Sequence, residues 1–361
     1  MTPLLLNALR VVDLRCHALG EWQFAPGPNL IVGDNGCGKT TLLEAVALMA
    51  HGRSFRQARD PLLVRWGSER FAVAGEWRRF GPVRVNARGQ RGQVELTLQG
   101  KSVRRRSDVS ELLPVVIEAP HGRRIVEGAT NERRRWLDHL AIALHEGLLG
   151  SYERYLRSVL QRNRLLRHGG SGMELEGWEM QIVLHGERIT AARKQLIAEL
   201  NRQLAQEKDL LDRPLKLRLE GSAPEGNEAW LTKLAALRSD DARQGGLRIG
   251  PHCDRLRLDD GGREHRNVGS RGQQKLAAIA LKLAEATLRG QHRQLVPLLL
   301  LDDCLEALDR QRQTRLLRRL QDYPGQVLMT APGGEEWLSG ERLTIHRMSA
   351  AGEAGTMEVA A

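Results

Sequence analysis

The loop Gly33-Asp34-Asn35-Gly36-Cys37-Gly38-Lys39-Thr40 decides the fold of this chain. It follows a short apolar run, Leu30-Ile31-Val32, and precedes a helical pattern over 40–50. Glycines let such a loop curl so that successive backbone N–H groups face a phosphate chain, and the following helix adds its positive dipole end. A strand, this loop and a helix predict a nucleotide site in an α/β protein.

The polar side chains of this P-loop have separate expected roles. Lys39 is expected to reach the β- and γ-phosphates, and Thr40 to place its hydroxyl on Mg²⁺. Cys37 fills a free position of the motif and receives no catalytic role. The predicted nucleotide contacts of this segment are Gly33, Asp34, Asn35, Gly36, Cys37, Gly38, Lys39, Thr40 and Thr41.

A second stretch, Leu298-Leu299-Leu300-Leu301, predicts a strand buried on both sides that ends in Asp302 and Asp303. We expect Asp302 to hold the Mg²⁺ hydration shell, and Asp303 to face the γ-phosphate and polarise the attacking water. Two adjacent carboxylates are costly to bury without a cation. The predicted catalytic residues are therefore Lys39, Asp302 and Asp303, and the predicted metal ligands are Thr40 and Asp302.

Two further motifs flank that strand. Ser270-Arg271-Gly272-Gln273-Gln274 opens a helix, and taken alone it is a capping box with Ser270 as N-cap. A capped helix N-terminus is also an anion site, so both interpretations are compatible. Glu306-Ala307-Leu308-Asp309 follows the acidic pair and by itself indicates no more than a helix start.

The rest of the chain predicts a helical region within an α/β frame. The helical pattern covers 133–211, and its second long helix runs roughly 30 residues, or about 45 Å, before Pro214 ends it. Other strands and helices are predicted at 70–103 (a β-meander), 215–219, 255–258, 274–288, 305–321 and 327–330. We therefore expect a head formed by 1–118 and 245–361, with an inserted, mainly helical lobe at 119–244.

Composition narrows the class of protein. An apolar fraction of 41% supports a packed core, and a net charge of +11 favours an anionic partner such as nucleic acid. The four cysteines form no CxxC pair, which favours reduced thiols in a cytoplasmic protein over a zinc site. No segment offers about 18 uninterrupted apolar residues, so we expect no membrane span.

These four motifs, in this order, resemble the head of ATP-binding cassette ATPases. Within that superfamily the chain resembles the RecF family, which is related to the SMC-like heads of structural-maintenance-of-chromosomes proteins. Three more stretches carry the resemblance, over about residues 4 to 345: Gly27-Pro28-Asn29-Leu30, Arg133-Arg134-Arg135-Trp136-Leu137-Asp138 and Gly250-Pro251-His252-Cys253-Asp254.

The resemblance implies an SMC-like P-loop ATPase head with an inserted helical lobe, and the cofactors ATP and Mg²⁺. It implies that Ser270, Gly272 and Gln273 bind the γ-phosphate held by a second subunit, and that Glu306-Ala307-Leu308-Asp309 lies at the subunit contact. The activity it implies is weak, DNA-stimulated ATP hydrolysis by an ATP-dependent homodimer. That dimer would act in the cytoplasm in DNA replication, DNA repair and the SOS response to DNA damage, with RecR and RecO and indirectly with RecA.

Four positions differ from the family's pattern. The chain has Arg15-Cys16-His17 where Arg-Asn-aromatic is usual, and Val116-Ile117-Glu118-Ala119-Pro120-His121 where a glutamine is expected. Gly269 precedes Ser270 in place of an apolar residue, and the switch position after the last strand is Thr330, not histidine.

Arginine clusters are the candidate DNA contacts, and they are found at Arg104-Arg105-Arg106, Arg123-Arg124, Arg133-Arg134-Arg135, Arg157, Arg162, Arg164 and Arg167. Aromatic residues make up only 4% of the chain and do not alternate with these clusters. Single-strand binding needs aromatic stacking platforms. The sequence therefore favours sequence-independent contact with a duplex backbone, including duplex/single-strand junctions.

Two other hypotheses stay open at this point. A P-loop kinase acting on a small molecule would use the same loop, and Ser270 and Gln273 would then only cap their helix. A nucleotide-gated scaffold that barely hydrolyses ATP would hold DNA as its function.

Overall fold

The computed structural model of the chain describes residues 1–56, 60–90, 93–120, 125–170, 172–333, 342–348 and 359–360. The chain divides into two compact units. The first, the head, contains Met1–Arg123, Glu207–Asp212 and Gly269–Ala361, and the second, the helical lobe, contains Arg124–Gln206 and Arg213–Val268.

The head is built around a six-stranded, mostly parallel sheet. Its central strands are buried almost throughout, because apolar residues face both sides of the layer. In spatial order they are β17 (Val359–Ala360), β16 (Thr344–Met348), β4 (Pro28–Gly33), β15 (Val327–Pro332), β14 (Leu298–Leu301) and β9 (Val115–Glu118). All neighbouring pairs are parallel except β16 with β17.

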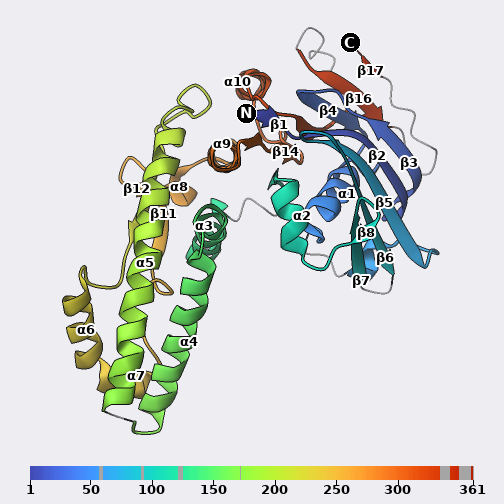
Figure 1. Cartoon of the computed structure of the whole chain (residues 1–361). Coiled ribbons are helices and arrows are strands. Elements are labelled where there is room, and N and C mark those ends of the chain that lie inside the picture. Colours follow the sequence, from blue (N-terminus) through green and yellow to red (C-terminus); the bar gives the residue numbers. More distant parts are fainter. Residues whose placement is uncertain are drawn as a thin grey trace. The chain divides into compact units, whose positions relative to one another are not determined.

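A second, antiparallel sheet of six strands lies on the other side of helix α1 (Lys39–His51). Its strands alternate buried and exposed residues, which is typical of a sheet with one solvated face. In order they are β3 (His17–Gln23), β2 (Leu5–Leu14), β5 (Arg70–Arg78), β6 (Pro82–Gln90), β7 (Gln93–Leu98) and β8 (Lys101–Ser102). Figure 1 shows α1 between the two sheets, where residues 41–50 are all buried.

Shorter elements complete the head. Helix α9 (Arg271–Arg293) packs against β9 and β13 (Leu295–Val296), and β13 pairs with β1 (Thr2–Pro3). Helix α2 (Arg106–Leu112) packs on α1. The remaining elements are a 3₁₀ turn at Asp60–Leu63 and helix α10 (Arg310–Gln321).

The helical lobe centres on two long antiparallel helices, α4 (Leu148–Arg167) and α5 (Met173–Leu204) (Figure 1). Along α5 the buried residues recur every three or four positions, as an amphipathic helix requires. Helix α3 (Thr130–Leu144) and helices α6 (Asn227–Ala236) and α7 (Arg238–Gln244) pack against this pair. A Cβ at Gly186 would lie 2.3 Å from the Trp230 ring, so a glycine there permits α6 to approach α5 closely.

A small antiparallel sheet completes the lobe. Strand β11 (Arg255–Asp260) lies between β10 (Lys216–Glu220) and β12 (Arg263–Glu264), and α8 (His265–Val268) follows. This pairing explains why residues 245–268, which the sequence assigned to the head, cluster with the lobe. The boundaries 1–118, 119–244 and 245–361 stay a prediction.

Most predicted elements appear, including the β-meander of residues 70–103 and a second long helix of 32 residues. The helix predicted over 305–321 is wrong at its start, because α10 begins only at Arg310. The Asp309 carboxylate accepts the N–H of Arg312 (2.9 Å), and this N-cap fixes the start of the helix. None of the described helices is long and apolar enough to cross a membrane.

Candidate functional site

The predicted site residues meet at one edge of the parallel sheet. Strand register places Leu301 opposite both Met329 and Glu118, and Gly33 opposite Pro332, so β4, β15, β14 and β9 all end at this edge. Ligands in open α/β sheets bind at the carboxyl ends of parallel strands. The edge therefore brings together the P-loop after β4 and the acidic pair after β14.

The P-loop depends on glycine at two positions. Gly36 and Gly38 have φ angles of 86° and 105°, which other residues rarely adopt. A Cβ at Gly38 would lie 2.3 Å from Nε2 of His17 and 2.9 Å from Sγ of Cys16, so a side chain has no room. Nε2 of His17 lies 3.2 Å from the carbonyl oxygen of Gly38. Because a carbonyl oxygen only accepts hydrogen bonds, this nitrogen carries the proton.

Lys39 is a buried cation with neutral partners in this loop. Its side chain folds back so that Nζ donates to the carbonyl oxygens of Gly33 (2.7 Å) and Asp34 (2.9 Å). Carbonyl dipoles hold the ammonium in place without neutralising its charge. The loop thus holds a lysine side chain against its own backbone, and a lysine in a glycine-rich loop before a helix is typical of a polyphosphate site.

The acidic pair is organised by a threonine on the neighbouring strand. Thr330 on β15 donates from Oγ1 to Oδ1 of Asp302 (2.8 Å) and accepts the backbone N–H of Asp303 (2.7 Å). Burial raises the pKa of the Asp302 carboxyl, while hydrogen bonds from Thr330 and Thr40 act in the opposite direction. Sequence reasoning placed Thr330 at the switch position after the last strand but did not predict its contacts with the acidic pair.

Asp303 stands in an unusual backbone conformation. Its φ is 49°, in the left-handed region that residues with a side chain seldom adopt, and Ala307 in the same loop has a φ of 62°. Asp303 lines the cleft in front of the P-loop, while Asp302 lies behind it and is 3% exposed. The two carboxylates therefore occupy different positions, one facing the solvent-accessible cleft and one beside Thr40 and Thr330.

A cleft of about 530 Å³ opens in front of these residues. Its lining is mostly polar and includes three cationic side chains near one carboxylate. The lining residues are Arg15, Cys16, Asn35, Gly36, Gly38, Lys39, Thr40, Thr41, Arg56, Leu62, Val64 and Asp303. A cleft with this charge balance suits a polyanion such as a nucleotide triphosphate.

Two of its cations were not predicted as nucleotide contacts. Arg15 forms a bidentate ion pair with the buried carboxylate of Glu44 (2.9 and 2.8 Å), and Ser54 also donates to Glu44. Arg56 lies in the loop after α1, and its charge lowers the pKa of Asp302, opposing the larger effect of burial. No pattern in the sequence distinguished Arg56 from its neighbours.

The Ser270 motif lies at the start of α9 and is not part of this cleft. The capping box is confirmed, since Ser270 N–H donates to Oε1 of Gln273 (2.8 Å) and Ser270 Oγ accepts from Gln273 N–H (3.3 Å). The side chain of Gln273 also donates to Asp212 (3.1 Å). Ser270 is exposed, and neither it nor Gly272 or Gln273 lines the cleft of its own chain. Their predicted nucleotide contacts stay a prediction.

Glu118, in the region where the family has a glutamine, ends β9 and is buried. Its carbonyl oxygen accepts the N–H of Asp302 (2.9 Å), so β9 helps to fix the position of the acidic pair. Within the described residues, no group of three or more histidine, cysteine or acidic side chains is arranged to hold a metal ion.

Two of the predicted DNA contacts are wrong, because the structure buries them in the lobe. Arg133 is 1% exposed, pairs with Glu264 and donates to backbone oxygens. Arg162 is fully buried between Glu179 (2.9 Å) and Asp241 (2.7 Å). A guanidinium enclosed by carboxylates cannot reach a DNA phosphate. Arg123 and Arg124 lie outside the described residues.

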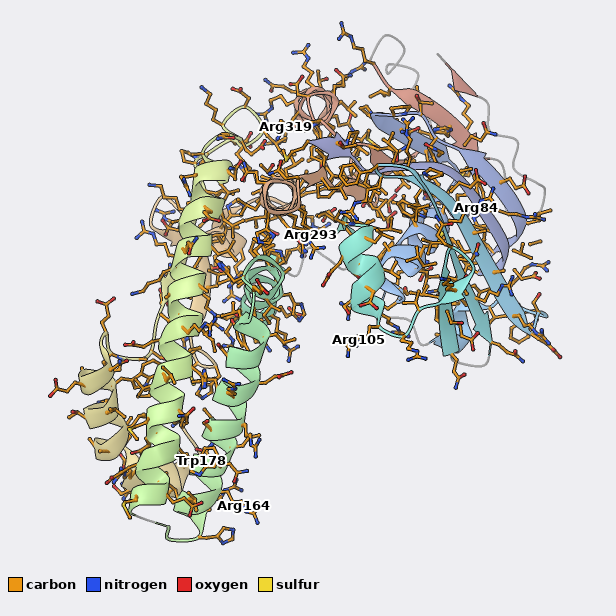
Figure 2. All side chains as sticks on the ribbon, viewed as in Figure 1. Arg84, Arg105, Arg164, Trp178, Arg293 and Arg319 are labelled. Atoms are coloured by element: carbon orange, nitrogen blue, oxygen red, sulfur yellow. The ribbon has the colours of Figure 1, made fainter. Side chains whose placement is uncertain are left out.

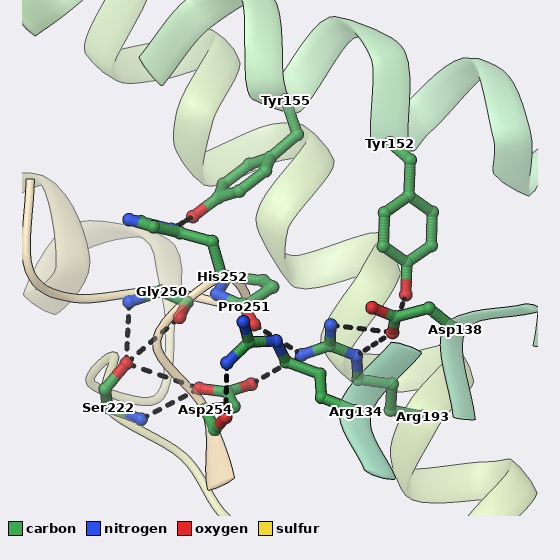
Figure 3. A network of polar contacts seen from close by, with 10 residues as sticks. All are labelled: Arg134, Asp138, Tyr152, Tyr155, Arg193, Ser222, Gly250, Pro251, His252 and Asp254. Atoms are coloured by element: carbon green, nitrogen blue, oxygen red, sulfur yellow. Dashed lines mark hydrogen bonds and ion pairs between the residues drawn. The ribbon is translucent and has the colours of Figure 1, made fainter. Parts of the chain in front are cut away.

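The segment Gly250-Pro251-His252-Cys253-Asp254 forms a turn held by a polar network (Figure 3). Arg193 from α5 pairs with Asp254 (3.0 Å) and Asp138 (2.7 Å), and Tyr155 from α4 contacts Nδ1 of His252 (2.7 Å). Burial lowers the pKa of His252. Because these contacts connect α3, α4 and α5 to the turn, this motif organises the lobe.

Comparisons with known proteins cover nearly the whole chain. The family model of the RecF/RecN/SMC N-terminal domain matches residues 6–344. A DNA replication and repair protein RecF from Stenotrophomonas maltophilia is 34% identical over 343 residues, covering 90% of this chain and 92% of the relative.

Solved structures share the fold. A structure of the recombination mediator protein RecF-ATP in the RecFOR pathway superposes with a TM-score of 0.78 at 24% identity, covering 99% of this chain and 98% of its own. An Smc head domain from Pyrococcus furiosus superposes with a TM-score of 0.62 at 15% identity, covering 99% and 96%.

Proposed function

The chain belongs to the RecF/RecN/SMC N-terminal domain family and, within it, to the RecF proteins, and from that premise we propose an ATP-dependent DNA-binding protein of replication-coupled recombinational repair. Two chains enclose two ATP molecules and close on DNA as a clamp. The clamp holds duplex DNA and duplex/single-strand junctions and assists recombinase loading at gaps.

The observation that carries this proposal is the cleft at the sheet edge. It places the cationic Lys39, the P-loop N–H groups and the carboxylate of Asp303 around one space of about 530 Å³. Arg56 also lines this cleft, as does Arg15 in its ion pair with Glu44. In this assignment Lys39 turns from the loop carbonyls to the β- and γ-phosphates, and Asp303 orients the attacking water.

The residues present fit Mg²⁺. The buried carboxyl of Asp302 has its pKa raised by burial and stands within hydrogen-bonding range of Thr40. A hard cation accepts a carboxylate and a hydroxyl as ligands and compensates the charge of a buried carboxylate. When bound, Mg²⁺ would neutralise charge on the phosphates; Thr40 and Asp302 would hold it, and Thr330 would fix the orientation of Asp302.

The position of Ser270 supports a composite site. A phosphate-binding helix N-terminus that is exposed and outside its own chain's cleft is available to a second chain. A partner related by two-fold symmetry would present Ser270, Gly272 and Gln273 to this nucleotide and receive the same in return. The site would be complete only in the dimer.

DNA binding would use the arginines that remain exposed. Arg104, Arg105 and Arg106 are exposed in the head, as are Arg157, Arg164 and Arg167 in the lobe. Figure 2 labels Arg105, which precedes α2, and Arg164, which lies on α4. Contacts of this kind bind phosphates irrespective of base sequence. RecR and RecO, and indirectly RecA, are the proposed protein partners, as the RecFOR pathway of the related structure suggests.

Mixing two inactive variants tests the proposal. Lys39→Ala removes the phosphate contact, and Ser270→Arg fills the place of the partner's γ-phosphate. Each variant alone should be inactive. Their mixture should recover ATPase activity, because a mixed dimer has one site that combines the intact P-loop of the Ser270→Arg chain with the intact Ser270 of the Lys39→Ala chain. The measurement is phosphate release in the presence of duplex DNA across mixing ratios.

Recovery supports a site shared between chains. Absence of recovery, with both variants folded by circular dichroism, would contradict the composite site. It would favour a self-contained nucleotide site of the kind found in small-molecule kinases.

A further inference from the structure

Five residues after Ser270, helix α9 carries a buried lysine that the proposed function has not used. Lys275 is 1% exposed. Its Nζ donates to the carbonyl oxygen of Glu306 (3.0 Å) and to that of Asp303. The same helix that would present Ser270 to a partner's nucleotide therefore also holds the backbone next to the carboxylate of its own site.

The loop that Lys275 contacts is held in a costly conformation. Asp303 and Ala307, both non-glycine residues, have φ angles of 49° and 62°. Residues with a side chain adopt such angles only where the surroundings fix them. Because the buried Lys275 ammonium binds two carbonyl oxygens of this loop, it restricts the loop backbone at both of those residues.

A second contact fixes the same loop to the same helix. A Cβ at Gly272 would lie 2.9 Å from the carbonyl oxygen of Ala307, so α9 and the loop touch backbone to backbone. Beyond the loop, Asp309 caps α10, and Gln313 donates to the carbonyl oxygen of Leu305 (3.1 Å). The first turn of α9 and the loop from Asp303 to Asp309 thus form one packed unit.

We propose that Lys275 is a positioning residue that sets the Asp303 carboxylate of its own subunit by holding the backbone of the loop against α9. The inference rests on the proposed function. Lys275 and the loop it contacts belong to the same subunit as Asp303, so the effect of the lysine on turnover belongs to the site that takes its Asp303 from that subunit.

The placement of the lysine predicts a subunit-specific effect. In the mixed dimer described above, the working site takes its P-loop and Asp303 from the Ser270→Arg chain and its Ser270 from the Lys39→Ala chain. Lys275→Met keeps the length and apolar stem of the side chain but removes the ammonium. It is added either to the chain that supplies Asp303 or to the chain that supplies Ser270, and ATP turnover is measured in both arrangements.

In the chain that supplies Asp303, Lys275→Met should lower kcat about 10²-fold, the usual cost of misplacing a catalytic group by about 1 Å. KM for ATP should stay within about threefold, because the P-loop contacts are intact. In the chain that supplies Ser270, kcat should fall by less than about threefold. Lys282→Met is the matched control on the same helix, since Lys282 pairs with Glu285 (2.8 Å), and it should be neutral in both arrangements.

The proposal would be overturned if Lys275→Met lowered kcat equally in both arrangements, lowered it only in the chain that supplies Ser270, or lowered it in neither. Where the Met variant fails to fold, Lys275→Gln retains an N–H donor and should give the same asymmetry with about a tenfold loss. Failure of the proposed function is visible separately, because the mixture with Lys275 intact would then recover no ATPase activity at all.

Discussion

The nucleotide cleft and the core of the helical lobe both enclose cationic side chains, but their partners differ. In the cleft, Lys39 donates to the carbonyl oxygens of Gly33 and Asp34. In the lobe, Arg162 lies between the carboxylates of Glu179 and Asp241, and Arg193 between those of Asp138 and Asp254. Arginine is abundant throughout, so residue type alone does not separate the two regions.

The difference lies in whether the charge is compensated inside the chain. A guanidinium with buried carboxylate partners is part of the structure, and removing it leaves those carboxylates uncompensated. A lysine that is held only by neutral oxygens keeps its charge available to an incoming anion. A substitution of Lys39 should therefore affect ATP and leave stability nearly unchanged, while a substitution of Arg162 or Arg193 should do the reverse.

The largest effect is expected for Lys39→Ala. Loss of the ammonium should reduce kcat/KM for ATP about 10³-fold or more, because one charged contact to the transferring phosphate is removed. The melting temperature should stay within a few degrees of wild type. Steady-state phosphate release and thermal unfolding measure both, and wild-type ATPase activity in the purified variant would refute the assignment.

In the lobe, Arg162→Met should destabilise the protein by about 3–5 kcal/mol, because it leaves the buried carboxylate of Asp241 without its arginine partner. Arg157→Met on the exposed side of the same helix is the control and should change stability by less than about 0.5 kcal/mol. Urea unfolding measures both. The comparison fails if Arg162→Met unfolds like the control.

A smaller effect is expected for Asp303→Asn. Most cassette ATPases place a glutamate after the strand aspartate. Unless the backbone compensates, the shorter side chain here should sit more than about 1 Å further from the attacking water, which weakens general-base assistance. Removing the carboxylate should then lower kcat by about 10²-fold, at the low end of such effects. ATP binding should persist, because Lys39, Thr40 and Asp302 are unchanged. Asp302→Asn is the contrasting variant and should weaken Mg²⁺-dependent binding itself, measured with a fluorescent ATP analogue.

The smallest effect is expected on DNA binding. Arg164→Gln combined with Arg167→Gln should weaken binding evenly across base sequences. The log–log salt slope should fall by about 1 for each DNA phosphate that the variant no longer neutralises. Fluorescence anisotropy at several salt concentrations measures the slope. An unchanged slope would remove these exposed arginines from the DNA surface.

Local signals allowed the sequence to predict the P-loop, the acidic pair and the Ser270 cap. Each is a short motif whose chemistry is carried by adjacent residues, such as Asp302 and Asp303 at the end of an apolar strand. Thr330 and Lys275 escaped prediction because their partners lie on other elements and become neighbours only through sheet register and helix packing.

The arginines show that prediction from the sequence is limited in the same way when it assigns too many functional residues. The sequence treated Arg133 and Arg162 as candidate DNA contacts, since a run of basic residues looks alike whether exposed or buried. Their carboxylates, Glu264 for the first and Glu179 and Asp241 for the second, come from other elements of the lobe. Only the fold reveals which arginines have their charge compensated by a buried carboxylate.

Sedimentation velocity of the Asp303→Asn chain with and without Mg²⁺–ATP tests the central claim most directly, because this variant should bind ATP without consuming it. The account predicts a monomer without nucleotide, a stable dimer with Mg²⁺–ATP, and slower release of duplex DNA by that dimer than by wild type. With Ser270→Arg added, the chain should bind ATP and stay monomeric. A chain that stays monomeric with Mg²⁺–ATP bound, or that releases DNA faster than wild type, would contradict it.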